Sequence, residues 1–328
     1  GKSLKRILRY FIGVILTMIS LGSFQTAHAI DNAEVYNIEL MKENNIESGL
    51  GAEYDSIESL VNDLIAEYNI NSDEISFAYY NFTSDQHYYI NPDLQMIAAS
   101  TIKVPIVALY LDLIAQGQYT FDSQIPYVED YIGGGTTGTT SSLADLMSNA
   151  IIYSDNSAWY SLMSNYGSFS DNRQAILDFV GYYDVPGEFF ADNYSSAYLA
   201  EQWLIKVAVN PDYQYVVNLM KQTDPKQLFT SYIAQGMANK YGRLDNYIHD
   251  TGIYYENNQA QYVLAIYTNN QEQADPFIEM LSLRINEWYR SHYLSAEYTP
   301  IDIKKNESGV SITKTQNEDS TITETSQE

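Results

Sequence analysis

The stretch IAASTIKVPIVALYLDLIAQG, from Ile97 to Gly117, places a serine and a lysine at the start of a long apolar run. The run stays apolar over several helical turns, so we expect a buried helix that begins near Ser100. Lys103 then lies one turn after Ser100, on the same face of the helix. A serine hydroxyl becomes a nucleophile when a base takes its proton, and a lysine desolvated by burial can be that base.

The same spacing also has a purely structural explanation. Ser100 or Thr101 can cap the N-terminus of the helix while Lys103 points into solvent. The chain repeats the spacing at Ser311 and Lys314, in a polar stretch near its end where no buried helix is expected. The spacing alone therefore favours the cap, and the choice depends on what the rest of the chain supplies.

The start of the chain is typical of a secretory leader. Four basic residues come first, followed by an apolar run over residues 11–22 and by the small-residue site Ala27-His28-Ala29. We therefore expect a signal peptide over residues 1–29 and a secreted protein, either extracellular or associated with the cell wall. An uncleaved anchor is the alternative. The apolar run is short for a membrane span, so we expect no stable membrane insertion after cleavage.

The remainder of the chain is strongly acidic. The formal charge is −25 for the whole sequence, and the leader holds four positive charges and no acid, which leaves −29 for the rest. Such a charge repels phosphate backbones, so we expect no nucleic acid partner. The chain has no cysteine, which excludes thiolate nucleophiles, thiolate metal sites and disulfides. No two of the four histidines show metal-ligand spacing, so we expect no metal and no other cofactor.

Periodicity divides the chain into a linker over residues 30–52, one domain over residues 53–297 and a disordered polar tail over residues 298–328. Helical spacing predicts a first helix over residues 55–68 and a last helix over residues 275–294. Strands are predicted over residues 75–82, 87–90, 237–244, 249–256 and 261–268. The chain between the second and third strands reads as mostly helical. We therefore expect an α/β (α+β) fold: a five-stranded antiparallel sheet flanked by helices, with an inserted all-helical lobe and a site in the cleft between the lobes.

Two further polar motifs follow the first one along the chain. Ser154-Asp155-Asn156 lies between two apolar helical stretches, where a polar trio must sit in a short buried connection and find hydrogen-bond partners. A second copy of this trio, over residues 170–172, precedes a helical run and is most simply its N-cap. Lys240-Tyr241-Gly242 lies inside a predicted strand. Its lysine can hold a substrate carboxylate, and its glycine lets the backbone come close to an acyl group.

Together and in this order, the three motifs are the signature of penicillin-recognising serine enzymes. The chain resembles the class A β-lactamase family, in the broad sense that includes β-lactamase-like serine hydrolases, over residues 55–294. The resemblance implies that Ser100 is the acylated nucleophile and that Lys103 is its base or proton shuttle. It also implies that Ser154 passes the proton to the leaving nitrogen.

The resemblance also assigns residues to substrate binding. It implies that Asn156 binds the side-chain amide of the substrate and that Lys240 attracts the substrate carboxylate. It further implies that Gly242 lies beside the acyl group. The oxyanion hole would be formed by the backbone N–H groups of Ser100 and Arg243.

The chain departs from the family pattern at two places. Tyr241 stands where the family has Thr or Ser, so a hydroxyl offered to the carboxylate is lost or displaced, and the ring either turns away from the cleft or narrows it. The family also carries a long loop with an ExxxN pattern that holds the deacylating glutamate. Here the matching stretch, GYYDVPGEFFAD over residues 181–192, is shorter, and Glu188 is its one candidate base. Without such a base, water attack loses a contribution of about 10²–10⁴-fold, so we expect slow deacylation.

We therefore expect a secreted, monomeric serine hydrolase that forms an acyl-enzyme with β-lactams and hydrolyses them slowly, an activity connected with β-lactam catabolism and antibiotic resistance. Two alternatives stay open. One is a D-Ala-D-Ala peptidase that acts on peptidoglycan stem peptides and shares the acylation chemistry. The other is a non-catalytic cell-wall binding protein on a degenerate hydrolase scaffold, which Tyr241 and the missing loop glutamate favour.

Overall fold

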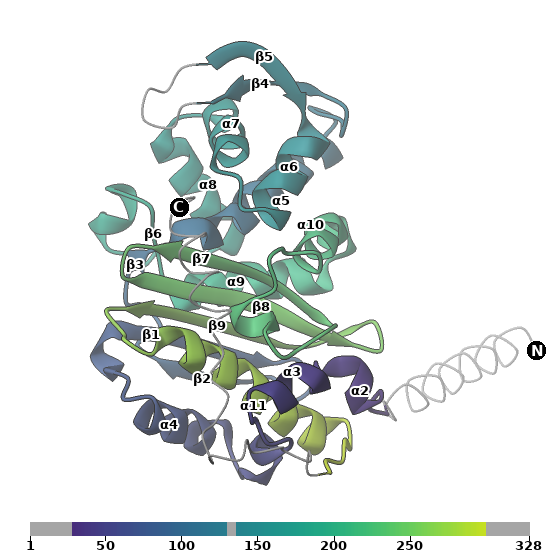
Figure 1. The fold of residues 1–328 in the computed structure, drawn as a ribbon. Coiled ribbons are helices and arrows are strands. Elements are labelled where there is room, and N and C mark those ends of the chain that lie inside the picture. Colours follow the sequence, from purple (N-terminus) through teal and green to yellow (C-terminus); the bar gives the residue numbers. More distant parts are fainter. Residues whose placement is uncertain (1–27, 130–135, 300–328) are drawn as a thin grey trace, which may run out of the picture.

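A five-stranded antiparallel sheet lies at the centre of the computed structural model, which describes residues 28–129 and 136–299 (Figure 1). Its strands are β1 (Ile75–Asn81), β2 (Gln86–Ile90), β7 (Met237–Leu244), β8 (Tyr247–Glu256) and β9 (Gln259–Asn269). They lie in the order β2-β1-β9-β8-β7, so strands from both ends of the chain combine in one sheet. The predicted fold class, a five-stranded antiparallel sheet with flanking helices, is confirmed.

Side chains along each strand alternate between two apolar cores, one on each face of the sheet. On β9, Leu264 and Ile266 belong to one core, whereas Val263 and Ala265 belong to the other. This alternation follows from the two-residue period of a strand. The turn between β8 and β9 contains two asparagines with φ of 56° and 59°, a left-handed conformation that asparagine tolerates better than most residues.

Helices cover both faces of this sheet (Figure 1). On one face, α4 (Ile57–Glu67) and α11 (Ala274–Tyr293) share an apolar core with the strands. Helix α4 begins at Ser56, whose hydroxyl accepts a hydrogen bond from the backbone N–H of Ser59 at 3.1 Å, and it buries Leu60 and Leu64 at helical spacing. On the other face, α9 (Ala197–Val209) and the helical lobe share the second core.

The helical lobe contains α5 (Lys103–Ala115), α6 (Leu143–Ile152), α7 (Asn156–Tyr166) and α8 (Phe169–Val180), with α10 (Gln214–Met220) beside it. Helix α5 is apolar over most of its length and buried in the lobe, as its sequence predicts. A two-stranded ribbon of β4 (Gln124–Val128) and β5 (Thr136–Ser142) lies at the outer end of the lobe (Figure 1). The prediction of mostly helical structure missed this ribbon, because its second strand is built from Thr, Ser and Gly, which are as common in loops.

Residues 30–52, which we expected to form a linker, are part of the domain. They form α2 (Asn32–Val35), α3 (Ile38–Glu43) and the short helix η1 (Leu50–Glu53). Val35 and Met41 are buried in the same core as α11. These helices are too short to show a hydrophobic period in the sequence, and their burial depends on the far end of the chain.

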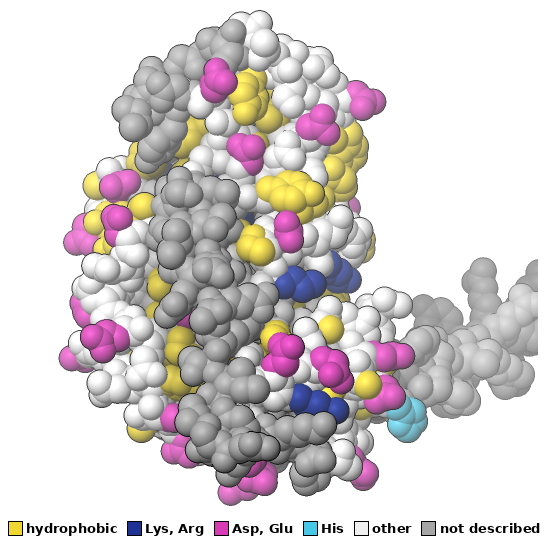
Figure 2. All heavy atoms as spheres, viewed as in Figure 1, with side chains coloured by type: hydrophobic (Ala, Val, Ile, Leu, Met, Phe, Trp, Pro, Cys, Tyr) yellow, Lys and Arg dark blue, Asp and Glu magenta, His cyan; other side chains and the backbone are white. Residues whose placement is uncertain are grey.

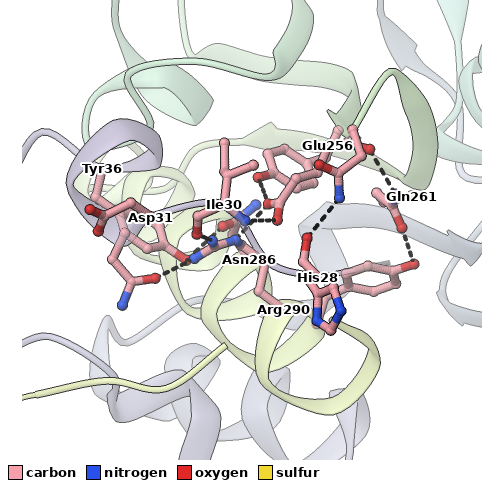
Figure 3. Close-up of polar contacts among 12 residues, drawn as sticks. His28, Ile30, Asp31, Tyr36, Glu256, Gln261, Asn286 and Arg290 are labelled. Carbon is pink, nitrogen blue, oxygen red and sulfur yellow. Dashed lines mark hydrogen bonds and ion pairs between the residues drawn. The ribbon is translucent and has the colours of Figure 1, made fainter. Parts of the chain in front are cut away.

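Arg290 of α11 fixes this N-terminal segment in place (Figure 3). Its Nη1 donates to Oδ1 of Asn32 at 2.6 Å, and its Nη2 donates to the carbonyl of Ile30 at 2.6 Å, across 260 positions of sequence. Its Nε donates to Oε1 of Glu256 at 2.6 Å, and both of these side chains are 0% exposed. A buried guanidinium needs an acceptor for each of its donors, so the segment and the sheet are both held by one side chain.

The leader and the tail lie almost wholly outside the described residues. The described part of the leader is its last two residues, and the described part of the tail begins at Tyr298, whose hydroxyl lies 2.8 Å from that of Tyr36. Tyr298 therefore packs on the domain instead of belonging to a disordered tail. Within residues 28–129 and 136–299, no helix has the length and apolar character needed to cross a membrane.

Most of the Lys and Arg side chains in the described part of this acidic protein are buried. Acidic side chains are scattered over the face shown in Figure 2, whereas Lys and Arg side chains appear there at few places. Lys103, Lys240, Arg173, Arg243 and Arg290 are all buried. Because burying a cation is costly unless it is bonded, each of them must serve a specific contact.

We predict that Arg290→Met lowers the free energy of unfolding by about 3–5 kcal/mol, because it leaves the Glu256 carboxylate buried without its counter-charge. Denaturant unfolding measures the change. Lys42→Met is the control, since Lys42 is 44% exposed and lies 3.9 Å from the exposed Glu39, and it should change stability by no more than about 0.5 kcal/mol. Equal unfolding of both variants would contradict the anchoring role of Arg290.

Candidate active site

Ser100 lies in the short helix η3 (Ala99–Ile102), which leads directly into α5, and its side chain is fully buried. The preceding residue, Ala99, has a φ of 50°, a left-handed conformation that a non-glycine residue adopts at an energetic cost. Just before it, β3 (Met96–Ile97) pairs with β6 (Tyr194–Ser195), and the backbone N–H of Ala98 donates to the carbonyl of Asn193 at 2.7 Å. The surrounding backbone therefore imposes the position of Ser100.

A buried histidine of the sheet supports the same segment. Nε2 of His249 lies 2.7 Å from the carbonyl of Ile97, and its Nδ1 accepts a hydrogen bond from the backbone N–H of Thr268 at 3.0 Å. Because Nδ1 accepts, Nε2 carries the proton and donates to Ile97. Burial lowers the pKa of His249 to about 4, so the ring is neutral near pH 7. The sequence marked this histidine only as a strand residue.

Lys103 is fully buried, and its Nζ is surrounded by four oxygen atoms. It lies 2.6 Å from Oγ of Ser100 and 2.8 Å from Oδ1 of Asn156. It also lies 2.9 Å from the carbonyl of Ser154 and 3.1 Å from Oγ of the same residue. Helix α5 begins without a side-chain cap. The alternative interpretation, a capping serine and a lysine in solvent, is therefore wrong.

The polar trio supplies the third side chain of this group. Ser154 lies in the turn between α6 and α7 with a φ of 58°, and its Oγ donates to Oγ of Ser100 at 2.6 Å. Asp155 caps α7 by accepting the backbone N–H of Ala158 at 2.9 Å, so it braces the turn. The second copy of the trio, which we expected to be an N-cap, lies in the first turn of α8; the N-cap is Ser168, two residues before Ser170. Only the first copy meets Ser100.

Edge strand β7 passes close to Ser100 because it has a glycine there. A Cβ atom on Gly242 would lie 2.8 Å from the backbone nitrogen of Ser100, 2.9 Å from Cβ of Ala99 and 3.0 Å from the carbonyl oxygen of Ala98. These distances are shorter than carbon atoms normally allow, so this position needs glycine. The free edge of the sheet is thereby brought against the start of η3.

Lys240 and Tyr241 leave the backbone of β7 in opposite directions, as neighbouring strand residues do, yet their side chains are in contact. Lys240 lies two residues before Gly242 and is fully buried, and its Nζ lies 4.1 Å from the ring centre of Tyr241. Tyr241 lies in the core shared with α11, and its hydroxyl donates to the carbonyl of Asp224 at 3.4 Å. The tyrosine ring therefore turns away from the cleft and does not narrow it.

The charge of Lys240 acts on a buried carboxyl group of the neighbouring strand. Asp250 of β8 accepts the backbone N–H of Phe229 at 2.9 Å and is bonded by the amide of Asn239. Burial raises the pKa of Asp250 to about 7, whereas these hydrogen bonds and the positive charge of Lys240 act in the opposite direction. The charge of Lys240 therefore has a buried carboxyl group, that of Asp250, near it.

The side chain of Arg243 bonds groups other than Ser100. Its guanidinium forms a two-pronged ion pair with Asp275 at the start of α11, with distances of 3.1 and 2.7 Å. Its Nε also donates to Oε1 of Gln227 at 2.8 Å. The side chain thus ties β7 to α11.

Glu188 is not held at Ser100. It lies in η4 (Gly187–Phe190) with an exposed side chain, and the described residues offer its carboxylate no hydrogen bond or ion pair. The next residue, Phe189, is buried instead, and its carbonyl accepts Nε of Arg173 at 2.9 Å. Arg173 also donates to the carbonyl of Tyr194. This buried arginine of α8 holds the short loop that runs from Gly181 to Tyr194. No local pattern in the sequence identified it.

A pocket of about 260 Å³ adjoins the group around Ser100. Its lining includes Ile102 of η3, Trp159 and Met163 of α7, Arg173 of α8 and Asn193 of the short loop. The Trp159 ring centre lies 5.5 Å from Nζ of Lys103, and Nδ2 of Asn193 donates to the carbonyl of Ala99 at 3.3 Å. Trp159 follows Asn156 by three positions on one helix face, a spacing that could have indicated its place beside the site.

In the described ranges, no group of three or more His, Asp or Glu residues could hold a metal ion.

Comparison with known proteins relates this arrangement to a family of enzymes. A family model described as "Beta-lactamase enzyme family" matches residues 56–289, which include every residue of the site. No curated protein sequence matches the chain.

Solved structures of similar fold carry low sequence identity. An ancestral class A β-lactamase (GNCA) is 18% identical with a TM-score of 0.60, and the match covers 71% of this chain and 99% of that one. A β-lactamase from Chitinophaga pinensis is 18% identical with a TM-score of 0.59, over 72% of this chain and 99% of that one. The penicillin G acyl-enzyme complex of a PBP-A variant is 17% identical with a TM-score of 0.59, over 72% and 96%. At these identities the likeness shows the fold alone.

We predict that Gly242→Ala lowers the free energy of unfolding by about 1–3 kcal/mol, because the added methyl group overlaps the backbone of η3. Gly187→Ala is the matched control, since a Cβ there meets no atom within 4 Å, and its stability should stay within about 0.5 kcal/mol of the wild type. Denaturant unfolding compares the three proteins. If both variants unfold at the same denaturant concentration as the wild type, β7 does not approach Ser100 as described.

Proposed function

Since the chain belongs to the β-lactamase enzyme family, we propose that it is a serine hydrolase whose Ser100 attacks the carbonyl carbon of a β-lactam ring. One observation carries the proposal. Oγ of Ser100 lies 2.6 Å from Nζ of Lys103 and also 2.6 Å from Oγ of Ser154. A hydroxyl in contact with a buried amine and a second hydroxyl has both a base for its proton and a path by which that proton can travel.

Lys103 is the base in this proposal. A charged Lys103 donates to Ser100, whereas a neutral Lys103 accepts the hydroxyl proton through the same contact. Burial favours the neutral form of an amine. As the bond between Oγ and the carbonyl carbon forms, the proton moves to Nζ, which the Asn156 and Ser154 oxygens hold in position.

Ser154 returns this proton to the substrate. When the bond between the carbonyl carbon and the lactam nitrogen breaks, that nitrogen takes the proton of Ser154, and Nζ of Lys103 at 3.1 Å replaces it. The proton lost by Ser100 thus ends on the leaving nitrogen, and Lys103 is neutral again. The acyl group stays on Ser100 as an ester.

Backbone and side-chain donors around Ser100 bind the substrate in this proposal. The N–H groups of Ser100 and Arg243 stabilise the negative oxygen of the tetrahedral intermediate. Asn156 donates from its amide nitrogen, since its Oδ1 already accepts from Lys103. Lys240 attracts the substrate carboxylate, without the hydroxyl that relatives offer beside it, because Tyr241 faces the core.

Release of the acyl group is slow in this proposal. Water attack on the ester needs a general base, and the exposed Glu188 carboxylate has no contact among the described residues that would hold it near the ester. The same feature favours the second candidate function, a D-Ala-D-Ala peptidase of peptidoglycan stem peptides, which shares the acylation step. The third candidate, a non-catalytic wall-binding protein, leaves the Ser100–Lys103 contact without a purpose.

We infer that the protein works outside the cell, as a monomer that is secreted or associated with the cell wall. The basic and apolar start of the sequence supports the secretion in this inference. Both candidate substrates, β-lactams and peptidoglycan stem peptides, are met in that compartment.

We predict that benzylpenicillin adds one acyl group to the protein and that the adduct decays slowly after free drug is removed. Intact-mass spectrometry over time measures both steps. Ser100→Ala should form no adduct, and Ser311→Ala, which changes the other serine with the same spacing, should behave as the wild type. A wild-type protein that stays unmodified and consumes none of several β-lactams and stem-peptide analogues would contradict both enzymatic functions, whereas rapid consumption of the drug would contradict slow deacylation.

A further inference from the structure

The pocket beside Ser100 lies on the acyl side of the proposed substrate. Along β7, Lys240 precedes Gly242 and Leu244 follows it, and Leu244 lines the pocket. A strand advances about 3.3 Å per residue, so Lys240 and Leu244 lie about 7 Å from Gly242 in opposite directions. A penicillin carries its carboxylate next to the leaving nitrogen and its side chain next to the carbonyl carbon. With the carboxylate toward Lys240, the side chain runs toward Leu244 and into the pocket.

Arg173 places a buried positive charge on the wall of this pocket. Its side chain is only 2% exposed and bonds two backbone carbonyls, those of Phe189 and Tyr194. Its guanidinium also lies 3.8 Å from the ring centre of Phe189 and 5.6 Å from that of Phe169. Carbonyls and rings attract the cation but do not neutralise it, and the ion pairs formed among the described residues do not include Arg173.

Two acidic side chains on the pocket lining do not remove this charge. Asp192 and Asp245 are exposed, so water screens them, and Oδ1 of Asp192 accepts the backbone N–H of Asn193 at 2.7 Å. Burial lowers the pKa of Arg173 to about 9, and the charge of Asp192 acts in the opposite direction. Arg173 is therefore still charged near pH 7, in a place where a buried charge is costly without a counter-charge.

We propose that the pocket binds the acyl side chain of the substrate and that Arg173 pairs with a carboxylate on that side chain. The inference rests on the proposed function, because it takes the acyl-enzyme at Ser100 as its starting point, and it adds the substrate class: acyl donors with an apolar stem and an anionic end. Ile102, Trp159 and Met163 supply the apolar wall for the stem. A carboxylate would give Arg173 an ion-pair partner, which it lacks among the described residues.

Penicillins with matched side chains test the inference. 6-Aminopenicillanic acid is acylated with unbranched chains of four, six or eight carbons that end in a carboxylate, a methyl group or an ammonium group. The second-order rate of Ser100 acylation is measured for each by intact mass. We expect the carboxylate-ended penicillin of the best length to react about tenfold or more faster than its methyl-ended partner, as a charged hydrogen bond allows.

Variants assign the preference to Arg173. Arg173→Met should bring the ratio of the carboxylate-ended to the methyl-ended rate close to one, and Arg173→Lys should keep part of it. Comparing two ligands on one variant cancels any general loss that a loosened loop causes. Lys206→Met is the matched control, because Lys206 also bonds a carbonyl, that of Phe179 at 2.8 Å, and lies over a ring, but lines no part of this pocket. Its ratio should equal that of the wild type.

The outcomes separate this inference from the proposed function. Equal rates for all three chain ends, a fastest ammonium-ended penicillin, or a preference that survives Arg173→Met would each overturn the role of Arg173, while acylation itself would still support the serine hydrolase. If none of the penicillins acylates Ser100, the proposed function fails, and this inference fails with it. If Arg173→Met does not fold, the wild-type ratio and its reduction in Arg173→Lys decide the matter.

Discussion

The fully buried amine of Lys103 is the group on which the arrangement of this domain depends. Its nitrogen contacts oxygens from η3, from the turn between α6 and α7, and from the first residue of α7. An amine in the interior is costly unless such partners are in place, so α5, α6 and α7 have to meet at one point. Ala99 and Ser154 adopt left-handed backbone conformations at this point, which cost energy in a residue other than glycine.

The sheet completes the site from the opposite side. Gly242 lets the edge strand β7 reach η3, and Arg243 fixes this strand by pairing with Asp275 of α11. His249 of the neighbouring strand β8 donates to the carbonyl of Ile97, just before η3. Arg290 holds the N-terminal segment in a similar way, by donating to the carbonyl of Ile30. In this acidic protein, Arg243 and Arg290 thus form buried contacts between elements that are distant in sequence.

The sequence could predict the parts of the fold that have a local signal. Alternating residues and asparagine turns give the five strands, and long apolar periods give α4, α5 and α11. In the site, the order of the three motifs along the chain indicated Ser100, Lys103 and Ser154 as residues that belong together. The decoys over residues 170–172 and 311–314 show that no single motif would have been enough.

The remainder depends on contacts that a local pattern does not contain. Residues 30–52 look like a linker because their helices are short and their core partners lie near the other end of the chain. Arg173 and His249 act through carbonyls of distant segments, and any residue can supply a carbonyl. The direction of the Tyr241 ring follows from its place on β7 relative to α11, which only the assembled sheet determines.

A crystal structure of the protein soaked with benzylpenicillin tests the central claim most directly. The account predicts continuous electron density from Oγ of Ser100 to the opened ring. The carbonyl oxygen of the new ester should lie about 3 Å from the backbone nitrogens of both Ser100 and Arg243. The penicillin side chain should enter the pocket toward Arg173. Density for the acyl group on another residue, or an ester carbonyl oxygen that points away from β7, would contradict the account.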